Sequence, residues 1–182
     1  MKDQLSFKSQ TSPLLFKKFL LSLTPKTLSK FTNFGKITIK NVDNIVKNEL
    51  SSSDKIKFFS FLNNELIGYS FLIKFDKSSK KHNCILGIVL ADNWQKKGFG
   101  KQICQHMIKM AWENKIEKIW LTVYQDNLDA YNMYKKIGFE VEGIFLYDEK
   151  FSGKFKHKIS MAIFKNHLNN NTKRKNILKN LD

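Results

Sequence analysis

The amino-acid sequence predicts a single α/β domain, with one sheet of mixed strand direction and helices packed on it. From residue 55 onward, segments of strand length alternate with segments of helical spacing, a pattern typical of α/β sheets. The run 84–91 is almost wholly apolar, as expected of a central strand covered on both faces. The 182 residues and 42% hydrophobic content suffice for one core and exclude a disordered chain. We expect one domain over residues 1–164 and a basic, disordered tail over residues 165–182.

The first 54 residues carry helix signals separated by breaks. Apolar spacing predicts a short amphipathic helix over 14–21. Thr24 before Pro25 predicts a second helix, because threonine caps helix N-termini and proline fits the first helical position. The stretch 36–40 is interpreted as a brief strand and 42–50 as a third short helix.

The middle and the end of the chain supply the remaining elements. Two strand-like runs, 55–62 and 66–75, flank Asn63 and Asn64 and predict a β-hairpin, and the apolar strand 84–91 follows. A long helix comes next, with a buried stripe at helical spacing made of Ile103, Met107, Met110 and Ala111. The last elements are a strand over 118–124, a helix over 128–136 ended by Gly138, and strands over 139–147 and 156–164 around a turn at Ser152 and Gly153.

The net charge of +16 raises the question of nucleic-acid binding. Of the 32 basic residues, however, Arg174 is the one arginine, and bidentate readout of bases and phosphates prefers the guanidinium group. We therefore interpret the charge as a solvated basic surface that attracts anionic small molecules. A basic nucleic-acid-binding protein stays open as an alternative.

Cysteine, histidine and hydropathy patterns exclude several other classes. Cys84 and Cys104 match neither a disulfide framework nor zinc-ligand spacing, so core packing is expected for both. The apolar runs are too short for a membrane span and the N-terminus lacks a signal-peptide pattern, which together with the cysteine usage favours a cytoplasmic location. No metal site is expected. Surface placement is expected for the histidines, His82, His106, His157 and His167.

One turn carries residues suited to phosphate binding. After the strand 84–91 the chain reads Gln95-Lys96-Lys97-Gly98-Phe99-Gly100-Lys101. The two glycines let a phosphate approach the main-chain N–H groups at the start of a helix, where the helix dipole favours anions, and the lysines add positive charge. The spacing matches neither a P-loop nor a dinucleotide fingerprint. Helix-entry glycines and ordinary surface lysines are the alternative interpretation.

A second motif lies later in the chain. The strand 118–124 is followed by Asn127, a helix containing Tyr134, and a glycine–phenylalanine pair that begins at Gly138. In this order the two motifs resemble the GNAT superfamily of acyl-CoA-dependent N-acetyltransferases, over about residues 55–164. The resemblance implies a single-domain GNAT fold, with a mixed central sheet, splayed fourth and fifth strands and flanking helices.

The resemblance also implies a role for individual residues. Val89 and Leu90 would hydrogen-bond the pantetheine arm of CoA as if it were an added strand. Asn127 would bind the cofactor, and Tyr134 would protonate the departing thiolate. The alternatives are a helix cap for Asn127 and packing on the sheet for Tyr134. The CoA pyrophosphate would be cradled by the backbone of Gln95, Lys96, Lys97, Gly98, Phe99, Gly100 and Lys101.

No glutamate stands where well-known members of the resembled family carry their general base. Thr122 occupies the position at which N-terminal protein acetylases of the ribosomal-protein alanine type carry glutamate, and residues 82–84 occupy the region used by histone-type members. Both subfamily interpretations therefore lose support. The remaining candidates are ordered water and three acidic residues, Glu142, Asp148 and Glu149.

The sequence therefore predicts an N-acetyltransferase. It would move an acetyl group from acetyl-CoA, its cosubstrate, directly to a primary amine of a small molecule, protein or peptide, in a ternary complex. Acetyl-CoA and the amine are the expected partners of a monomer or homodimer, without a membrane or nucleic acid. A CoA-binding module that has lost turnover is the main alternative, followed by the nucleic-acid-binding protein and by an interaction module built on the N-terminal helices.

Overall fold

Seven strands form one sheet in the computed structural model, which describes residues 4–31, 34, 36–151 and 153–165. Their spatial order is β1-β2-β3-β4-β5-β7-β6; β4 and β5 run parallel and the other neighbours antiparallel. The predicted mixed α/β sheet is confirmed. The strands are β1 (Leu5–Lys8), β2 (Lys55–Leu62), β3 (Glu65–Lys74), β4 (Asn83–Leu90), β5 (Lys118–Tyr124), β6 (Glu140–Phe151) and β7 (Lys154–Phe164).

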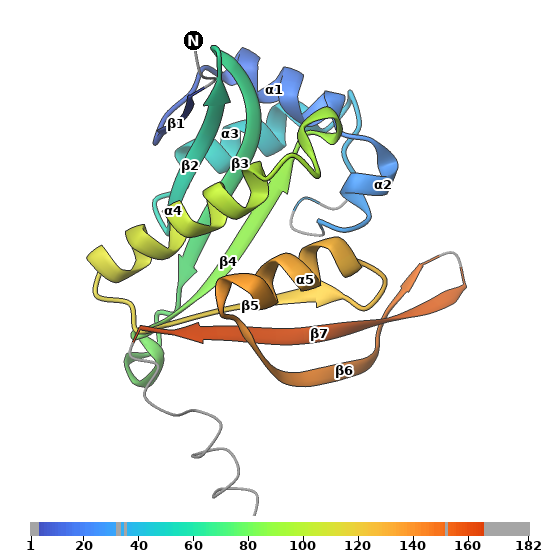
Figure 1. The fold of residues 1–182 in the computed structure, drawn as a ribbon. Coiled ribbons are helices and arrows are strands. Elements are labelled where there is room, and N and C mark those ends of the chain that lie inside the picture. The colour runs from blue at the N-terminus through green and yellow to red at the C-terminus, as the bar shows by residue number, and fades with distance from the viewer. Residues whose placement is uncertain (1–3, 32–33, 35, 152, 166–182) are drawn as a thin grey trace, which may run out of the picture.

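Helices cover both faces of the sheet. α4 and α5 pack on one face, and α1 and α3 pack on the other (Figure 1). In the described part of the chain no helix is long and apolar enough to cross a membrane. The helices are α1 (Pro13–Ser22), α2 (Pro25–Leu28), α3 (Val42–Ser51), α4 (Phe99–Glu113) and α5 (Leu128–Ile137), with short 3-10 turns η2 (Ser78–Lys80) and η3 (Asp92–Trp94).

The two faces of the sheet build two separate cores. Leu72 and Leu86 pack on the α4 face, whereas Tyr69 and Val89 pack on the α1 and α3 face. This division follows from the pleat, because successive side chains of a strand point to opposite faces. The Tyr69 hydroxyl donates a 2.6 Å hydrogen bond to Glu49 of α3, which fixes that helix on the sheet.

The sheet opens in its middle. β4 and β5 pair over three register positions, from Asn83 opposite Lys118 to Ile85 opposite Trp120. Beyond this point β4 continues along β3 and β5 continues along β7, so the two strands part (Figure 1). The splayed fourth and fifth strands are therefore confirmed, and they leave an opening between two halves of the sheet.

The N-terminal helix signals are confirmed. The Ser12 hydroxyl accepts the Leu15 N–H at the start of α1, and the Thr24 hydroxyl accepts the Thr27 N–H at the start of α2. Both are N-caps followed by proline, and the sequence predicts the one at Thr24 and Pro25.

The predicted strand over 36–40 is wrong. Asn41 Oδ1 accepts the N–H and the hydroxyl of Thr38 at 2.7 and 3.0 Å, and its amide donates to the Lys36 carbonyl at 2.8 Å. These side-chain bonds close the segment into a turn that leads into α3. The first strand is instead β1, which pairs with β2 at one edge of the sheet and which the sequence analysis did not identify.

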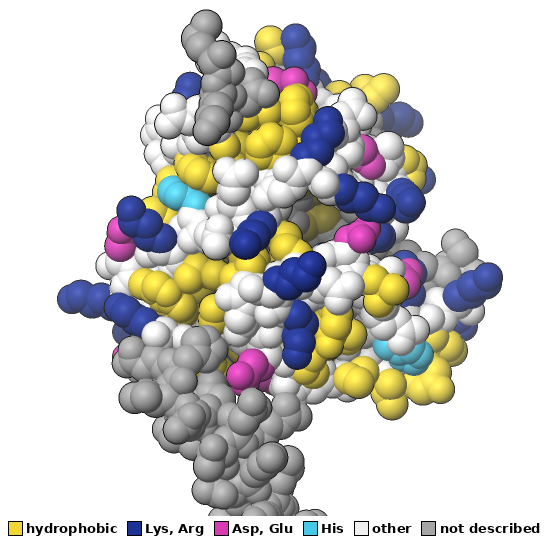
Figure 2. Space-filling view, in the orientation of Figure 1, with side chains coloured by type: hydrophobic (Ala, Val, Ile, Leu, Met, Phe, Trp, Pro, Cys, Tyr) yellow, Lys and Arg dark blue, Asp and Glu magenta, His cyan; other side chains and the backbone are white. Residues whose placement is uncertain are grey.

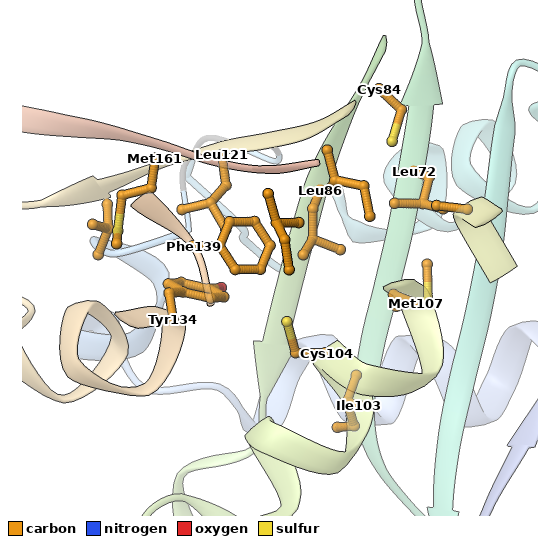
Figure 3. Packing of buried hydrophobic residues seen from close by; sticks show 14 of the residues in the cluster. Leu72, Cys84, Leu86, Ile103, Cys104, Met107, Leu121, Tyr134, Phe139 and Met161 are labelled. Atoms are coloured by element: carbon orange, nitrogen blue, oxygen red, sulfur yellow. The ribbon is translucent and has the colours of Figure 1, made fainter. Parts of the chain in front are cut away.

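The buried stripe of α4 differs from the predicted one by one residue. Cys104 is fully buried, whereas Met110 is half-buried. Cys104 and Met107 point from α4 toward the sheet (Figure 3). Burial raises the pKa of Cys84 to about 12 and also raises the pKa of Cys104. Both thiols therefore pack in the core, as expected.

Surface placement is wrong for His106. Its ring stacks on Phe7 of β1 with centroids 3.9 Å apart and meets Phe58 of β2 edge-on at 4.6 Å. His82 is exposed, as expected. The two aromatic rings draw His106 inward because a stacked imidazole buries apolar area that a solvated one would leave in water.

The β6–β7 hairpin is longer than predicted and carries a bulge between Phe145 and Glu149. At the bulge Tyr147 has a φ of 55°, and its N–H donates to Nδ1 of half-buried His157 at 2.8 Å. The expected exposure of His157 is therefore wrong in part. Three further expectations lie outside the described residues: Ser152 of the predicted turn, His167, and the tail over 166–182.

Candidate functional site

A cleft of about 730 Å³ lies where β4 and β5 part. The strands contribute residues 85–90 and 121–124, and α5 contributes Tyr134. From the opposite face of the sheet, α2 and the turn after it contribute Thr27, Lys30 and Phe31. The cleft therefore passes through the opening in the sheet and joins the α4–α5 face to the α2 face.

The turn before α4 has the geometry of an anion site. Lys96 and Gly98 adopt left-handed conformations, with φ of 61° and 86°. No side chain caps the start of α4, so the N–H groups of its first turn lack a helical partner. A Cβ added at Gly98 would meet nothing within 4 Å, which shows that the turn faces open space. Successive free N–H groups around a space fit a phosphate group.

Most predicted cofactor residues come together around the cleft. Two do not line it: Lys97 Nζ lies 4.9 Å from the centroid of the Trp94 ring, and Phe99 packs edge-on against the same ring. These two side chains stabilise the turn rather than face the cleft. The predicted site residues that line it are Val89, Leu90, Gln95, Lys96, Gly98, Gly100, Lys101, Asn127 and Tyr134.

The backbone of β4 offers alternate residues to the opening. The N–H of Ala91, the residue after β4, donates to the carbonyl of Ile67 in β3 at 2.8 Å. Along an antiparallel pair, every second residue points its N–H and C=O to the partner strand. Val89 lies two residues before Ala91, so its N–H and C=O also face β3. The backbone groups of Ile88 and Leu90 point the other way, toward the opening. The sequence analysis selected Val89 and Leu90; the register favours Ile88 and Leu90, whose backbone groups point to the opening, with the Leu90 carbonyl already accepting a hydrogen bond from Gln95.

Gln95 and Asp92 fix α2 beside the cleft. Gln95 Nε2 donates to the Leu90 carbonyl at 3.0 Å and to the Thr27 hydroxyl at 2.9 Å. Asp92 accepts the hydroxyls of Thr24 and Thr27 at 2.6 and 2.8 Å. Burial alone would raise the pKa of Asp92, but these hydrogen bonds outweigh it and hold the pKa below its ordinary value. Asp92 therefore stays ionised and anchored.

Asn127 makes a contact across the cleft. Asn127 is the N-cap residue of α5, and its carbonyl accepts the Tyr131 N–H, but its side chain makes no capping hydrogen bond. Instead, Asn127 Oδ1 accepts a 3.3 Å hydrogen bond from Nζ of half-buried Lys30. The sequence analysis did not identify Lys30, because nothing local in the sequence brings the turn after α2 to the start of α5.

Tyr134 belongs to the core and to the cleft at once. The residue is 8% exposed, and its ring packs edge-on against Phe139 with centroids 5.4 Å apart (Figure 3). Burial, with a smaller contribution from Cys104, raises the pKa of Tyr134 above its ordinary value. Its hydroxyl therefore keeps its proton at neutral pH, as a proton donor must.

A polar cluster of Tyr124, Asp148, Glu149 and Lys158 lies at the hairpin side of the cleft. The Tyr124 hydroxyl donates to Glu149, and Lys158 Nζ pairs with Glu149 and, at 3.0 Å, with Asp148. Burial would lower the pKa of Lys158, but the two carboxylates outweigh it and raise that pKa. Tyr124 and Lys158 line the cleft, so the cluster connects Glu149 to it.

The other candidates for a general base lie less favourably. Glu142 pairs with Lys118, at the end of β5 where the sheet is closed. Thr122 is exposed in the cleft wall, but its hydroxyl does not titrate near neutral pH. Within the described residues no three His, Cys, Asp or Glu side chains are grouped to hold a metal ion.

The cleft is lined with positive charge. Its one acidic lining residue among those described, Asp129, pairs with Lys96 at 3.3 Å. Figure 2 shows many more lysines than acidic side chains on the face drawn there. The lysines that line the cleft are Lys30, Lys96, Lys101, Lys136 and Lys158.

Comparisons with known proteins agree with this geometry. The model of the acetyltransferase (GNAT) family matches residues 31–139. The L-amino acid N-acetyltransferase AaaT of Escherichia coli K12 is 30% identical over 84 residues, which make up 45% of this chain. The match spans about half, 51%, of that relative's length.

Solved structures share the fold. A spermidine N-acetyltransferase from Vibrio cholerae, solved with CoA and spermine, superposes with a TM-score of 0.76 at 19% identity, covering 89% of this chain and 96% of that one. A crystallised protein described as a phosphinothricin N-acetyltransferase also reaches 0.76, at 12% identity, covering 90% of this chain and 100% of that one. At these identities the likeness is one of fold.

Proposed function

We infer the function from one premise: this chain belongs to the acetyltransferase (GNAT) family. We propose that it transfers an acetyl group from acetyl-CoA to a primary amine. The observation that carries the proposal is the cleft through the sheet, with the turn 95–101 at one side and Tyr134 beside it. Named relatives act on an L-amino acid and on spermidine, which supports an amine as the acceptor.

The cosubstrate enters from the α4–α5 face. The N–H groups at the start of α4 and the side chains of Lys96 and Lys101 bind the phosphates. The backbone N–H and C=O of Ile88 and the N–H of Leu90 hold the pantetheine arm along the open edge of β4. Acetyl-CoA supplies an activated acetyl group at the opening between the strands.

Three proton transfers accompany acetyl transfer. The acceptor ammonium first loses a proton through Tyr124, whose hydroxyl passes its own proton to Glu149 at the same time. The free amine then attacks, and the thioester C–S bond breaks as Tyr134 donates its proton to the leaving thiolate. The nitrogen gives up its second proton to solvent, solvent restores the proton to Tyr134, and Glu149 releases its proton, so that the net reaction frees one proton.

The test measures binding and turnover separately. Calorimetry with acetyl-CoA should give a dissociation constant in the micromolar range, and free thiol should be released when an amine panel is added. Gly98→Ala should weaken acetyl-CoA binding about tenfold, because alanine resists the left-handed φ that shapes the turn.

Gly153→Ala is the matched control. Gly153 has a similar φ of 80° and also lies in open space, but in the β6–β7 turn. Its alanine variant should lose similar stability and keep its affinity for acetyl-CoA. Absence of binding by the unaltered protein would refute the proposal. Binding without thiol release from any amine would instead support the module that has lost turnover.

A further inference from the structure

The two mouths of the cleft carry different elements. α4, α5 and the turn 95–101 border the cleft on the face assigned above to acetyl-CoA, and α2 with the turn after it borders the cleft from the other face, where Thr27 contacts Gln95 and Lys30 contacts Asn127. Since the acetyl group must meet its acceptor inside the opening, the acceptor enters past Thr27, Lys30 and Phe31. The charges on this side therefore bear on which amine is accepted.

Lys30 is the uncompensated charge at the acceptor mouth. In the described part of the chain it lies within ion-pair distance of no carboxylate, and it donates a hydrogen bond to the neutral side-chain amide of Asn127 at 3.3 Å. Asp92, close by in the fold, is already bonded to Thr24 and Thr27. Lys158, which also lines the cleft, is neutralised by Asp148 and Glu149.

The side of the cleft formed by the β6–β7 hairpin carries a net negative charge. Lys156 lies over the Tyr124 ring and is paired with Asp126. Glu149 and Asp148 therefore still carry one negative charge more than Lys158. An ammonium group is attracted toward this cluster, whereas an anionic group is attracted toward Lys30. A polyamine would bring further positive charges against Lys30, and like charges in a partly buried site are repelled.

We propose that the acceptor is an amine that also carries a carboxylate, and that Lys30 binds this carboxylate by exchanging its hydrogen bond with Asn127 for an ion pair. The inference rests on the proposed acetyl transfer and specifies its substrate class. Lys30 then acts as the residue that determines specificity. The amine group lies toward Tyr124 and Glu149, where it loses its proton.

The test compares each acid with its amide. A panel of α- and ω-amino acids, each paired with its primary carboxamide, and spermidine are assayed by thiol release with the full chain. We expect kcat/KM for the best acid to exceed that of its amide at least tenfold. Reactivity alone favours the amide, whose amine loses its proton more readily, so a preference for the acid reports recognition of the carboxylate.

Substitution of Lys30 then tests the residue. Lys30→Met should abolish the preference for the acid, through a higher KM for the acid and little change for the amide, and Lys30→Arg should keep most of it. Lys26→Met is the control, because Lys26 is exposed on α2, just before the turn that carries Lys30, and does not line the cleft. Its kinetics should equal those of the unaltered protein.

Three outcomes would overturn the inference. They are a higher kcat/KM for spermidine or an amide than for every acid, a preference for the acid that survives in Lys30→Met, and a Lys30→Met variant that binds acetyl-CoA more weakly and acetylates acid and amide equally slowly. Each of these leaves the proposed acetyl transfer intact, because thiol is still released. Loss of the proposed function itself is distinguished by calorimetry that detects no acetyl-CoA binding.

Discussion

Gly87 on β4 lies opposite Phe71 on β3, and the aromatic ring fills the space that a side chain at position 87 would need. A Cβ added there would fall 2.2 Å from Phe71 Cζ. Phe71 is fully buried in the core under α1 and α3. The pair therefore fixes β3 against β4 next to the cleft.

Gly87→Ala should destabilise the protein by about 1–3 kcal/mol, because the ring of Phe71 must move in a packed core. Chemical denaturation measures this change. Gly143→Ala, where an added Cβ meets nothing within 4 Å, should have little effect. Adding Phe71→Leu to Gly87→Ala should cost less than the sum of the two single changes. A Gly87→Ala variant as stable as the unaltered protein would contradict the steric argument.

Tyr134→Phe should lower kcat about 100-fold and leave the affinity for acetyl-CoA within twofold, because it removes a proton donor and keeps the packed ring. Since burial raises the pKa of Tyr134 above 10.0, kcat of the unaltered enzyme should not fall from loss of this proton as pH rises toward 10. Tyr131→Phe on the same helix should behave like the unaltered enzyme. Equal rates for the two variants would reject the acid role of Tyr134.

Glu149→Gln should reduce kcat/KM about 10- to 100-fold at pH 7, because the acceptor ammonium loses its proton acceptor. The deficit should shrink at higher pH, where the free amine forms in solution. Tyr124→Phe should show a similar deficit, since it interrupts the same path. Glu142→Gln serves as the control because Glu142 pairs with Lys118 away from the opening. The rates of both glutamate variants are measured in the pre-steady state and as a function of pH. Equal rates for Glu149→Gln and Glu142→Gln would exclude proton transfer through Tyr124 to Glu149.

His106 should make the protein less stable in mild acid. Burial, with the nearby charge of Lys109, lowers the pKa of His106 below 6.5 in the folded chain. The unfolded chain takes up the proton first, so the free energy of unfolding is largest above pH 6.5 and falls as pH drops through the lowered pKa. His106→Phe keeps the ring stack and should flatten this dependence in denaturation curves from pH 7.5 to 5.

The same variant should be at least as stable as the unaltered protein at pH 7.5. His106 Nε2 is buried and has no hydrogen-bond partner among the described residues, and removing such an atom relieves a desolvation cost. His82→Gln changes an exposed histidine and should leave the pH dependence as it was. A Phe variant that still loses stability in acid like the parent would show that another group is responsible.

Local signals in the sequence predicted most of the fold. Thr24 with Pro25 and Asn63 with Asn64 act on the backbone within a few residues of themselves, so their helix start and hairpin turn are predicted correctly. Residues 36–40 are not, because strand-like side chains are outweighed by the hydrogen bonds of Asn41.

The residues of the site also divide into those that local motifs predict and those that only the folded chain brings together. The turn 95–101 and Tyr134 belong to contiguous motifs, and the sequence analysis identified them. Lys30, Tyr124 and Lys158 reach the cleft through packing between segments far apart in the chain, and no spacing rule brings such residues together. The choice between Val89 and Ile88 depends on strand register, which fixes the direction of each backbone N–H only once β3 and β4 are paired.

The parting of β4 and β5 has a consequence for isotope exchange. Amide hydrogens at the centre of a sheet normally exchange slowly, because opening them requires unfolding much of the domain. Ile88 and Leu90 lie on a strand with neighbours on both sides in the sheet order, yet their amides face the opening. Deuterium should therefore enter at these two positions early while Val89 between them stays protected, an alternating pattern that a bound ligand along the edge would erase.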